Sequence, residues 1–185
     1  MIGAITAGLF SAGTPAVTNS YESIATVTLG SAQTTISFSS IPSTYKHLQL
    51  RFIARSTRVN AGDYMNMRFN SDSSSIYARH NIAGDGSGVG AGAQTSAAQI
   101  ELNRISAANA TSGVFGAGVI DLLDYANSSK NKTARALIAY DNNGSGDIYF
   151  QSGLWASTTA VNAISFTCNN DFAANSQFAL YGIKG

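Results

Sequence analysis

The stretch HLQLRFIAR, residues 47–55, alternates apolar and polar side chains, and this alternation decides the fold class. Successive side chains of a β-strand point to opposite faces, so the pattern predicts a strand with one buried face. The buried positions are then Leu48, Leu50, Phe52 and Ala54. The stretch YMNMRFN, residues 64–70, repeats the pattern and predicts a second strand with Met65, Met67 and Phe69 on its buried face.

Eight further runs show similar patterns and are separated by clusters of turn-forming residues. They are SIATVTL (23–29), TTISFSSI (34–41), QIELN (99–103), GVIDLLDY (118–125), RALIAYD (135–141), DIYFQS (147–152), AISFTC (163–168) and QFALYGI (177–183). About ten short strands at this spacing, with no long helical periodicity, are typical of an antiparallel β-sandwich or a jelly roll. We therefore expect one all-β domain with little helix.

Composition limits the classes of function. The chain has 185 residues, of which 11% are charged, and its formal net charge is +1. A protein that binds the phosphate backbone carries a strong basic excess, so we expect no nucleic-acid partner. Cys168 is the single cysteine, which excludes an intrachain disulfide and fits folding in a reducing compartment. It shares the parity of Ile164 and Phe166, so we expect a buried thiol.

The first residues, MIGAITAGLFSAGTPA (1–16), allow three interpretations. A signal peptide needs a basic n-region, yet no Lys or Arg precedes Lys46. A membrane helix needs about 20 mostly apolar residues, and the polar residues after Phe10 end the run well short of that, so we expect no membrane partner. The favoured interpretation is an uncharged attachment arm, residues 1–19, followed by a sandwich body, residues 20–185.

Two glycine-rich stretches resemble ligand loops only in part. DNNGSGDIYFQS, residues 141–152, begins like a calcium loop, but Ser152 stands where the bidentate Glu belongs, so a hairpin turn is favoured. GDGSGVGAG, residues 84–92, lacks the Lys-Ser or Lys-Thr of a phosphate loop and is interpreted as a mobile loop, which could equally be an exposed contact surface. We expect neither a metal nor a cofactor.

No constellation of catalytic side chains stands out either. His47 and His80 fall at polar-face positions and belong to no metal-ligand cluster. Asp121 and Asp124 fall on opposite faces of an extended segment, which spoils them as an acid and base pair. The favoured role of these two carboxylates is surface charge or a pairing with Arg135 or Lys132. We therefore expect no enzymatic activity.

Three side chains are candidates for a protein interface: Arg51, Arg55 and Trp155. Strand parity puts Arg51 and Arg55 on one face, where they either form ordinary solvated surface or pair with carboxylates of a partner. Trp155 either caps the core or stacks, with neighbouring Tyr residues, on a sugar ring. The sequence leaves these alternatives open.

Several stretches together resemble a family of small virion proteins of tailed bacteriophages. They are SYESIATVTLGSAQTTISFSSIPSTYKHLQLRFIAR (20–55), DLLDYANSSKNKTARAL (121–137), DNNGSG (141–146), SGLW (152–155) and FALYGIKG (178–185). Related chains are described as capsid decoration or cement proteins, as tail-fibre or minor tail proteins, or as virion structural proteins. The resemblance implies a β-rich body without enzymatic activity and leaves the position on the particle open.

The leading hypothesis is a capsid decoration (cement) protein, assembled in the host cytoplasm and located in the virion. Its expected partners are the major capsid protein or neighbouring virion proteins, and it is expected to form a homo-oligomer, in particular a trimer. The arm side chains expected to be buried on docking are Ile2, Ile5, Leu9, Phe10 and Val17. The alternatives are a tail-fibre or receptor-binding module that reads host-surface glycan, and a secreted adhesin or lectin.

Overall fold

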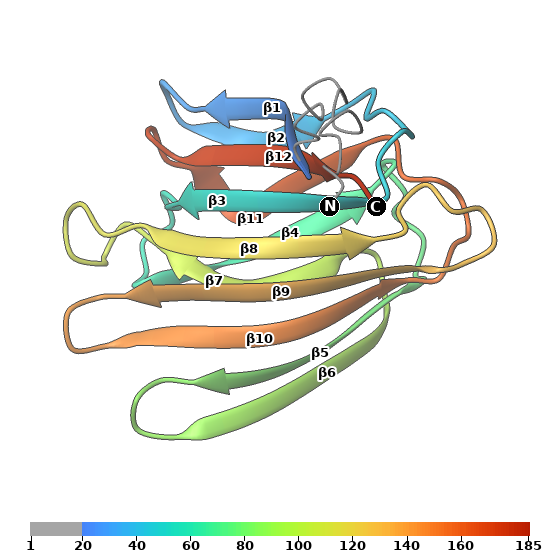
Figure 1. Ribbon diagram of the computed structural model, residues 1–185. Coiled ribbons are helices and arrows are strands. Elements are labelled where there is room, and N and C mark those ends of the chain that lie inside the picture. The colour runs from blue at the N-terminus through green and yellow to red at the C-terminus, as the bar shows by residue number, and fades with distance from the viewer. Residues whose placement is uncertain (1–19) are drawn as a thin grey trace, which may run out of the picture.

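The computed structural model describes residues 20–185, so the predicted arm, residues 1–19, lies outside the described residues. Within 20–185, twelve strands form two antiparallel sheets, and no residue is helical. The sheets stack face to face (Figure 1), which confirms the predicted all-β sandwich. The jelly-roll assignment stays a prediction.

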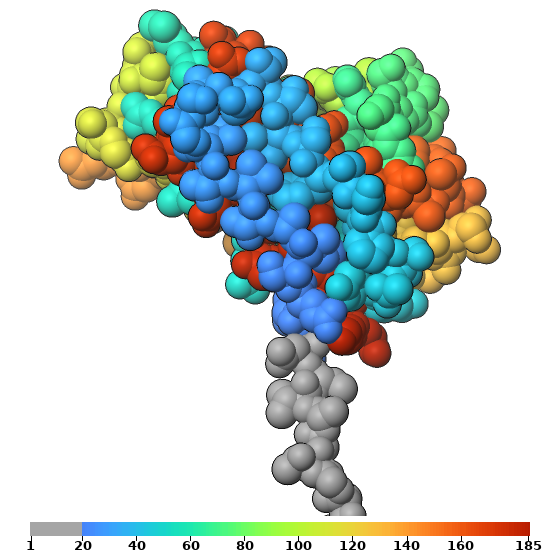
Figure 2. Space-filling model, turned by 90° about the horizontal axis from the view of Figure 1, so that it is seen from above, coloured from blue at the N-terminus to red at the C-terminus, as the bar shows by residue number. Residues whose placement is uncertain are grey.

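The large sheet has eight strands. Their spatial order is β1 (Tyr21–Thr28), β12 (Gln177–Ile183), β3 (His47–Ala54), β8 (Gly116–Leu123), β9 (Lys132–Asp141), β10 (Gly146–Trp155), β5 (Tyr77–Gly84) and β6 (Val89–Ala97). The small sheet has four strands, in the order β2 (Gln33–Phe38), β11 (Ile164–Phe172), β4 (Gly62–Phe69) and β7 (Ile100–Ser106). At one end β1 and β2, which follow each other in the chain, lie side by side and close the sandwich (Figure 2).

The core lies between the two sheets, and four phenylalanine rings join them. Phe178 of β12 stacks on Phe52 of β3 with ring centroids 5.6 Å apart. Across the interior it contacts Phe166 of β11 at 5.6 Å and meets Phe172 edge-on at 5.2 Å. The positions predicted to be buried in residues 47–55 and 64–70 are all buried, as is Cys168, and burial raises the pKa of its thiol to about 12.

Ten of the twelve strands coincide with the ten predicted runs, and the two others, β5 and β6, form a hairpin that the sequence pattern missed. The interpretation of residues 84–92 as a mobile loop is wrong. A turn occupies residues 85–88, and β6 begins at Val89. Figure 1 shows this hairpin at the far end of the large sheet from β1, beyond β7, the last strand of the small sheet. We call residues 77–97 the overhang.

A polar network forms the junction between the core and the overhang. Arg79 of β5 donates from Nη2 to Glu101 Oε1 of β7 at 2.5 Å. The buried Gln151 of β10 donates from Nε2 to the Glu101 carbonyl at 2.5 Å and accepts a hydrogen bond from Asn103. Side-chain amides and charges therefore end the core beside Arg79, whereas Tyr77 at the start of β5 is itself buried in the core.

Candidate functional site: an apolar face on the large sheet

The outer face of the large sheet, which points away from the small sheet, carries two neighbouring rows of apolar side chains. In the first row Phe150 of β10 lies between Ile82 of β5 and Leu137 of β9. In the second row Ile148 of β10 pairs with Ala139 of β9. Directly paired residues of antiparallel strands point to the same side, so the side chains of each row lie next to one another. We call this surface the outer apolar face.

The rows run across most of the large sheet. The first continues to Val119 of β8, and the second continues through Ala117 of β8 to Ile53 of β3. In the other direction the second row continues through Gly84 of β5 to Val89 of β6. Val119 is half-buried, and six large side chains of the two rows are strongly exposed: Val89 90%, Ile82 58%, Ile148 52%, Phe150 51%, Ile53 46% and Leu137 45%. A contiguous apolar patch of this breadth marks a site of interaction with another surface.

A polar row borders the outer apolar face. Arg135 of β9 donates from Nη2 to Asp121 Oδ2 of β8 at 2.8 Å, and Gln49 of β3 donates to Asp121 Oδ1 at 2.8 Å. Burial acts to raise the pKa of the Asp121 carboxyl, but these two hydrogen bonds hold it below its usual value. The predicted pairing of Asp121 with Arg135 is confirmed, and this ion pair marks where the apolar surface ends.

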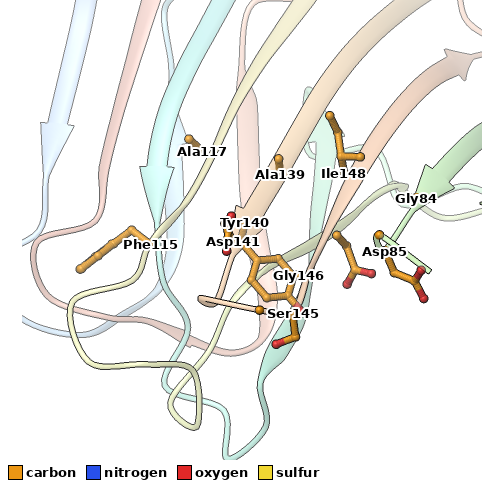
Figure 3. Close-up of a pocket in the computed structure, with 13 residues that line it drawn as sticks. Gly84, Asp85, Phe115, Ala117, Ala139, Tyr140, Asp141, Ser145, Gly146 and Ile148 are labelled. Carbon is orange, nitrogen blue, oxygen red and sulfur yellow. The ribbon is translucent and has the colours of Figure 1, made fainter. Parts of the chain in front are cut away.

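Two hollows open on the same face. One, of about 670 Å³, lies over β5, β6 and β10 and is lined by His80, Asn81, Ile82, Ala91, Gly92, Ala93, Phe150 and Ser152. The other, of about 550 Å³, lies beside the β9–β10 turn (Figure 3), and Ala117, Ala139 and Ile148 form its apolar wall. The carboxylates of Asp85 and Asp141 line its polar part. Both hollows suit apolar groups of a partner surface.

Two tight turns shape the second hollow. The Asp85 carboxylate accepts hydrogen bonds from the backbone N–H groups of Ser87 and Gly88, and these bonds lower its pKa. In the β9–β10 turn Gly146 has φ +149°, and a Cβ there would approach the Tyr140 carbonyl oxygen to 2.3 Å. The hairpin turn predicted for residues 141–152 is therefore present and requires glycine at position 146.

The interface arginines have different environments. Arg51 of β3 is exposed, and its guanidinium lies 5.3 Å from the ring centroid of Tyr181 and 5.7 Å from that of Tyr21. Arg55, just after β3, donates to four carbonyl oxygens of one loop: Ala108, Ala110, Thr111 and Val114. Arg55 therefore organises the β7–β8 loop, while Arg51 remains on the surface beside β1.

Of the two alternatives for Trp155, the structure confirms the core and corrects the interface role. Its side chain is 2% exposed, stacks on Tyr77 with centroids 6.2 Å apart and packs against Phe69. Its Nε1 donates to Asp72 Oδ2 at 2.8 Å. The apolar ring is buried and its polar edge is satisfied, so Trp155 offers no stacking surface for a sugar.

The remaining candidate residues and site types are as follows. The arm residues Ile2, Ile5, Leu9, Phe10 and Val17 lie outside the described residues. Among residues 20–185 there is no group of three or more His, Cys, Asp or Glu side chains arranged to hold a metal ion. His47 accepts a hydrogen bond on Nδ1 from the Asp124 backbone. The same part of the chain contains no helix with the length and apolarity of a membrane span.

Comparisons with known proteins add little. No protein-family model matches the chain, and no curated protein matches it in sequence. Among solved structures, the crystal structure of galectin LEC-6 from Caenorhabditis elegans is similar with a TM-score of 0.31 and 10% sequence identity, covering 84% of this chain and 94% of that chain. A TM-score this low supports no argument about function.

The sequence-based reasoning missed the outer apolar face. One signal was available, because DIYFQS, residues 147–152, and RALIAYD, residues 135–141, carry apolar residues at both parities. Two apolar parities are typical of a strand that is covered on both sides. In β10, Tyr149 lies on the face that is buried in the core, and Ile148 and Phe150 lie on the opposite, exposed face.

Proposed function

We propose that this chain is a structural protein of a tailed-bacteriophage virion, and more narrowly a capsid decoration protein that binds the head surface and stabilises the shell. The observation that supports a docking role best is the outer apolar face, with six strongly exposed large side chains. Covering such a surface is favourable because it removes apolar groups from water. The resemblance of residues 20–185 to small virion proteins supplies the class of partner.

The energetics favour attachment at more than one point. Fully burying a Val, Leu, Ile or Phe side chain contributes about 1.5–3 kcal/mol. Most of these side chains are already about half buried, so covering each contributes about 1 kcal/mol. Association has its own cost, which offsets most of the contribution of one face. The arm, residues 1–19, supplies a second attachment, to the shell or to a neighbouring subunit, and an oligomer presents several outer apolar faces at once.

Stabilisation of the shell then follows from mass action. A ligand that binds the assembled shell, and not the separated subunits, shifts the equilibrium toward assembly. A trimer that spans junctions between capsid subunits adds contacts across boundaries that the pressure of packaged DNA strains. The proposal requires no chemical reaction from the protein.

Co-sedimentation with empty heads of the parent phage tests the proposal. We expect the full chain to bind in many copies per head and a chain lacking residues 1–19 to lose binding while keeping the unfolding temperature of the body. A double variant, Ile148→Ser with Phe150→Ser, removes the centre of the outer apolar face and should weaken binding at least about tenfold. Val59→Ser is the matched control, because Val59 is 82% exposed and outside the face.

Two results would count against decoration. A truncated chain that still covers the heads at full occupancy would remove the arm from the mechanism. Antibody-gold labelling confined to the tail, together with binding to one saccharide class on a glycan array, would favour the tail-fibre alternative instead. A decoration protein should label the head in many copies and show no saccharide preference.

A further inference from the structure

Strand β6 is a sheet edge whose backbone groups have no partner on one side. It ends the large sheet, and its ladder with β5 runs from Gly84↔Val89 to Tyr77↔Ala97. Residues 89–97 make no backbone hydrogen bond to any other described segment. In an antiparallel ladder alternate residues direct their N–H and C=O groups away from the partner strand, so β6 presents a row of free donors and acceptors.

The composition of β6 does nothing to protect this edge. Edge strands are normally guarded by charges, proline, bulges or short length. Val89–Ala97, VGAGAQTSA, contains no charged residue and no proline. Its ladder with β5 is regular from Val89 to Gln94, and the register shifts only between Gln94 and Ala97, at the end of the strand. By contrast, β1 carries Glu22, β7 carries Glu101 and Arg104, and β2 has six residues against nine in β6. Small side chains allow another backbone to approach β6 closely.

The arm has matching chemistry. Residues 1–19 contain no charged side chain, and the apolar run Ile2–Phe10 has the same nine-residue length as β6. The described chain begins at Ser20, whose carbonyl accepts a hydrogen bond from the Lys184 backbone, next to β1. The arm therefore leaves the body at the edge of the large sheet opposite to β6.

Distance decides whether the arm reaches its own β6. A strand added beyond β6 lies eight strand spacings from β1, which is about 38 Å at about 4.8 Å per spacing. If Ile2–Phe10 forms that strand, the ten steps from Phe10 to Ser20 span at most about 36 Å when fully extended. The connection would also have to bend around the body, so it falls short within one chain.

We propose that Ile2–Phe10 of one copy pairs as an additional strand with β6 of a neighbouring copy. Each copy then donates an arm at one edge of its large sheet and accepts an arm at the other. Such head-to-tail contacts form a ring where the rotation between copies closes, and a ring of three copies is the expected trimer. The inference concerns copies of this chain alone, so it does not depend on the virion role.

The added strand also enlarges the outer apolar face. Val89 and Ala91 of β6 point to that face, and the next strand would place alternate arm side chains beside them. A ring presents several such faces together, which raises the overall affinity for any repetitive surface without a new kind of contact.

Disulfide trapping tests the pairing in the full chain. Single variants Ile5→Cys and Leu9→Cys on tagged chains are mixed under mild oxidation with untagged Ala91→Cys or Ala93→Cys chains. Native Cys168 stays unreactive, because it is buried and its thiol pKa is raised to about 12. We expect a mixed disulfide between two chains in at least one combination and none with Thr133→Cys, a control in β9. No mixed product in any combination would overturn the proposal, as would a double variant that closes within one chain.

Proline substitution provides an independent test by light scattering. Of the neighbouring positions Gly90 and Ala91, one directs its N–H to β5 and the other directs it outward. Proline at the outward position removes a donor for the arm and leaves the hairpin ladder intact, so it should reduce the oligomer to a monomer at an unchanged unfolding temperature. A parent chain that is monomeric would contradict the proposal. So would an oligomer that persists in both Gly90→Pro and Ala91→Pro.

Discussion

Strands β3, β8 and β12 belong to the same sheet as the overhang, but they are stabilised in different ways. The first group faces the small sheet and buries aromatic rings such as Phe52 and Phe178 against it. The overhang lies beyond β7, and most positions of β6 are exposed. The first group is held by packed hydrocarbon throughout, whereas the overhang is packed into the core at Tyr77 and is held elsewhere by the ladder between β5 and β10 and by polar contacts at the junction.

This contrast separates stability from function. The covered part of the sheet supplies the free energy of folding, and it leaves few groups free for a partner. The overhang and the neighbouring outer apolar face contribute less to folding and expose both apolar side chains and backbone donors. Regions of low local stability are where binding surfaces are found, because their groups are not already committed to the core.

Hydrogen exchange should show the largest difference between the two regions. In a chain lacking residues 1–19 we expect the amides of β6 to exchange at least ~10³ times faster than those of β9, because β6 opens locally and β9 opens with the whole domain. In the full chain, arm pairing should slow alternate amides of β6 and leave β9 unchanged. Equal protection of β6 and β9 in the truncated chain would show that the overhang is part of the cooperative core.

Truncation of a buried ring should give the next largest effect. Phe178→Ala removes a fully buried side chain that contacts three other rings and should reduce the free energy of unfolding by about 3–5 kcal/mol. Phe150→Ala on the outer apolar face is the matched variant and should cost no more than about 1 kcal/mol. Urea titration of both measures the difference, and similar losses would contradict the division between the two regions.

The same contrast explains how much of the fold could be predicted. The ten predicted strands lie in or next to the region where the two sheets face each other. There each strand has one buried face, so apolar and polar residues alternate along the sequence. β6 has no buried side, so its glycine and alanine pattern resembled a loop. Strand parity placed Cys168 in the core, and the pairing of Asp121 with Arg135 was one of the alternatives that the sequence offered. The outer apolar face depends on which strands become neighbours, and that order is a property of the topology.

Lys132 is a residue whose role the sequence could not indicate. A carboxylate partner was expected, but the side chain is fully buried and Nζ donates to the carbonyls of Asn127 at 2.7 Å, Lys130 at 2.7 Å and Thr158 at 3.0 Å. Burial lowers the pKa of this ammonium group. Backbone carbonyls are present in every residue, so no sequence pattern identifies the three that converge on one site.

Replacing Lys132 should have an intermediate effect. Lys132→Met keeps most of the hydrocarbon chain but leaves three carbonyls without their donor, so the free energy of unfolding should fall by about 1–3 kcal/mol. Lys130→Met is the control, because its side chain is 60% exposed and its ion pair with Asp124 should contribute less than about 1 kcal/mol. Equal losses from the two substitutions would mean that the buried ammonium does not organise these loops.

The smallest effect should come from Asp124, which lies just after β8. Hydrogen bonds from Lys130, at 2.5 Å, and Lys46, at 2.9 Å, lower the pKa of its carboxyl from 3.8 to about 2. A carboxyl with a lower pKa in the folded state stabilises the fold above about pH 4, and this contribution disappears as the pH falls toward 2. The parent should therefore exceed Asp124→Asn slightly in urea midpoint at pH 6 and equal it near pH 2, with the difference reduced by added salt. A difference that is independent of pH would assign the effect of the substitution to packing rather than to charge. Because this ion pair lies in the turn after β8, outside the overhang, the same titration should leave the exchange rates of β6 unchanged, which would separate surface electrostatics from the stability of the overhang.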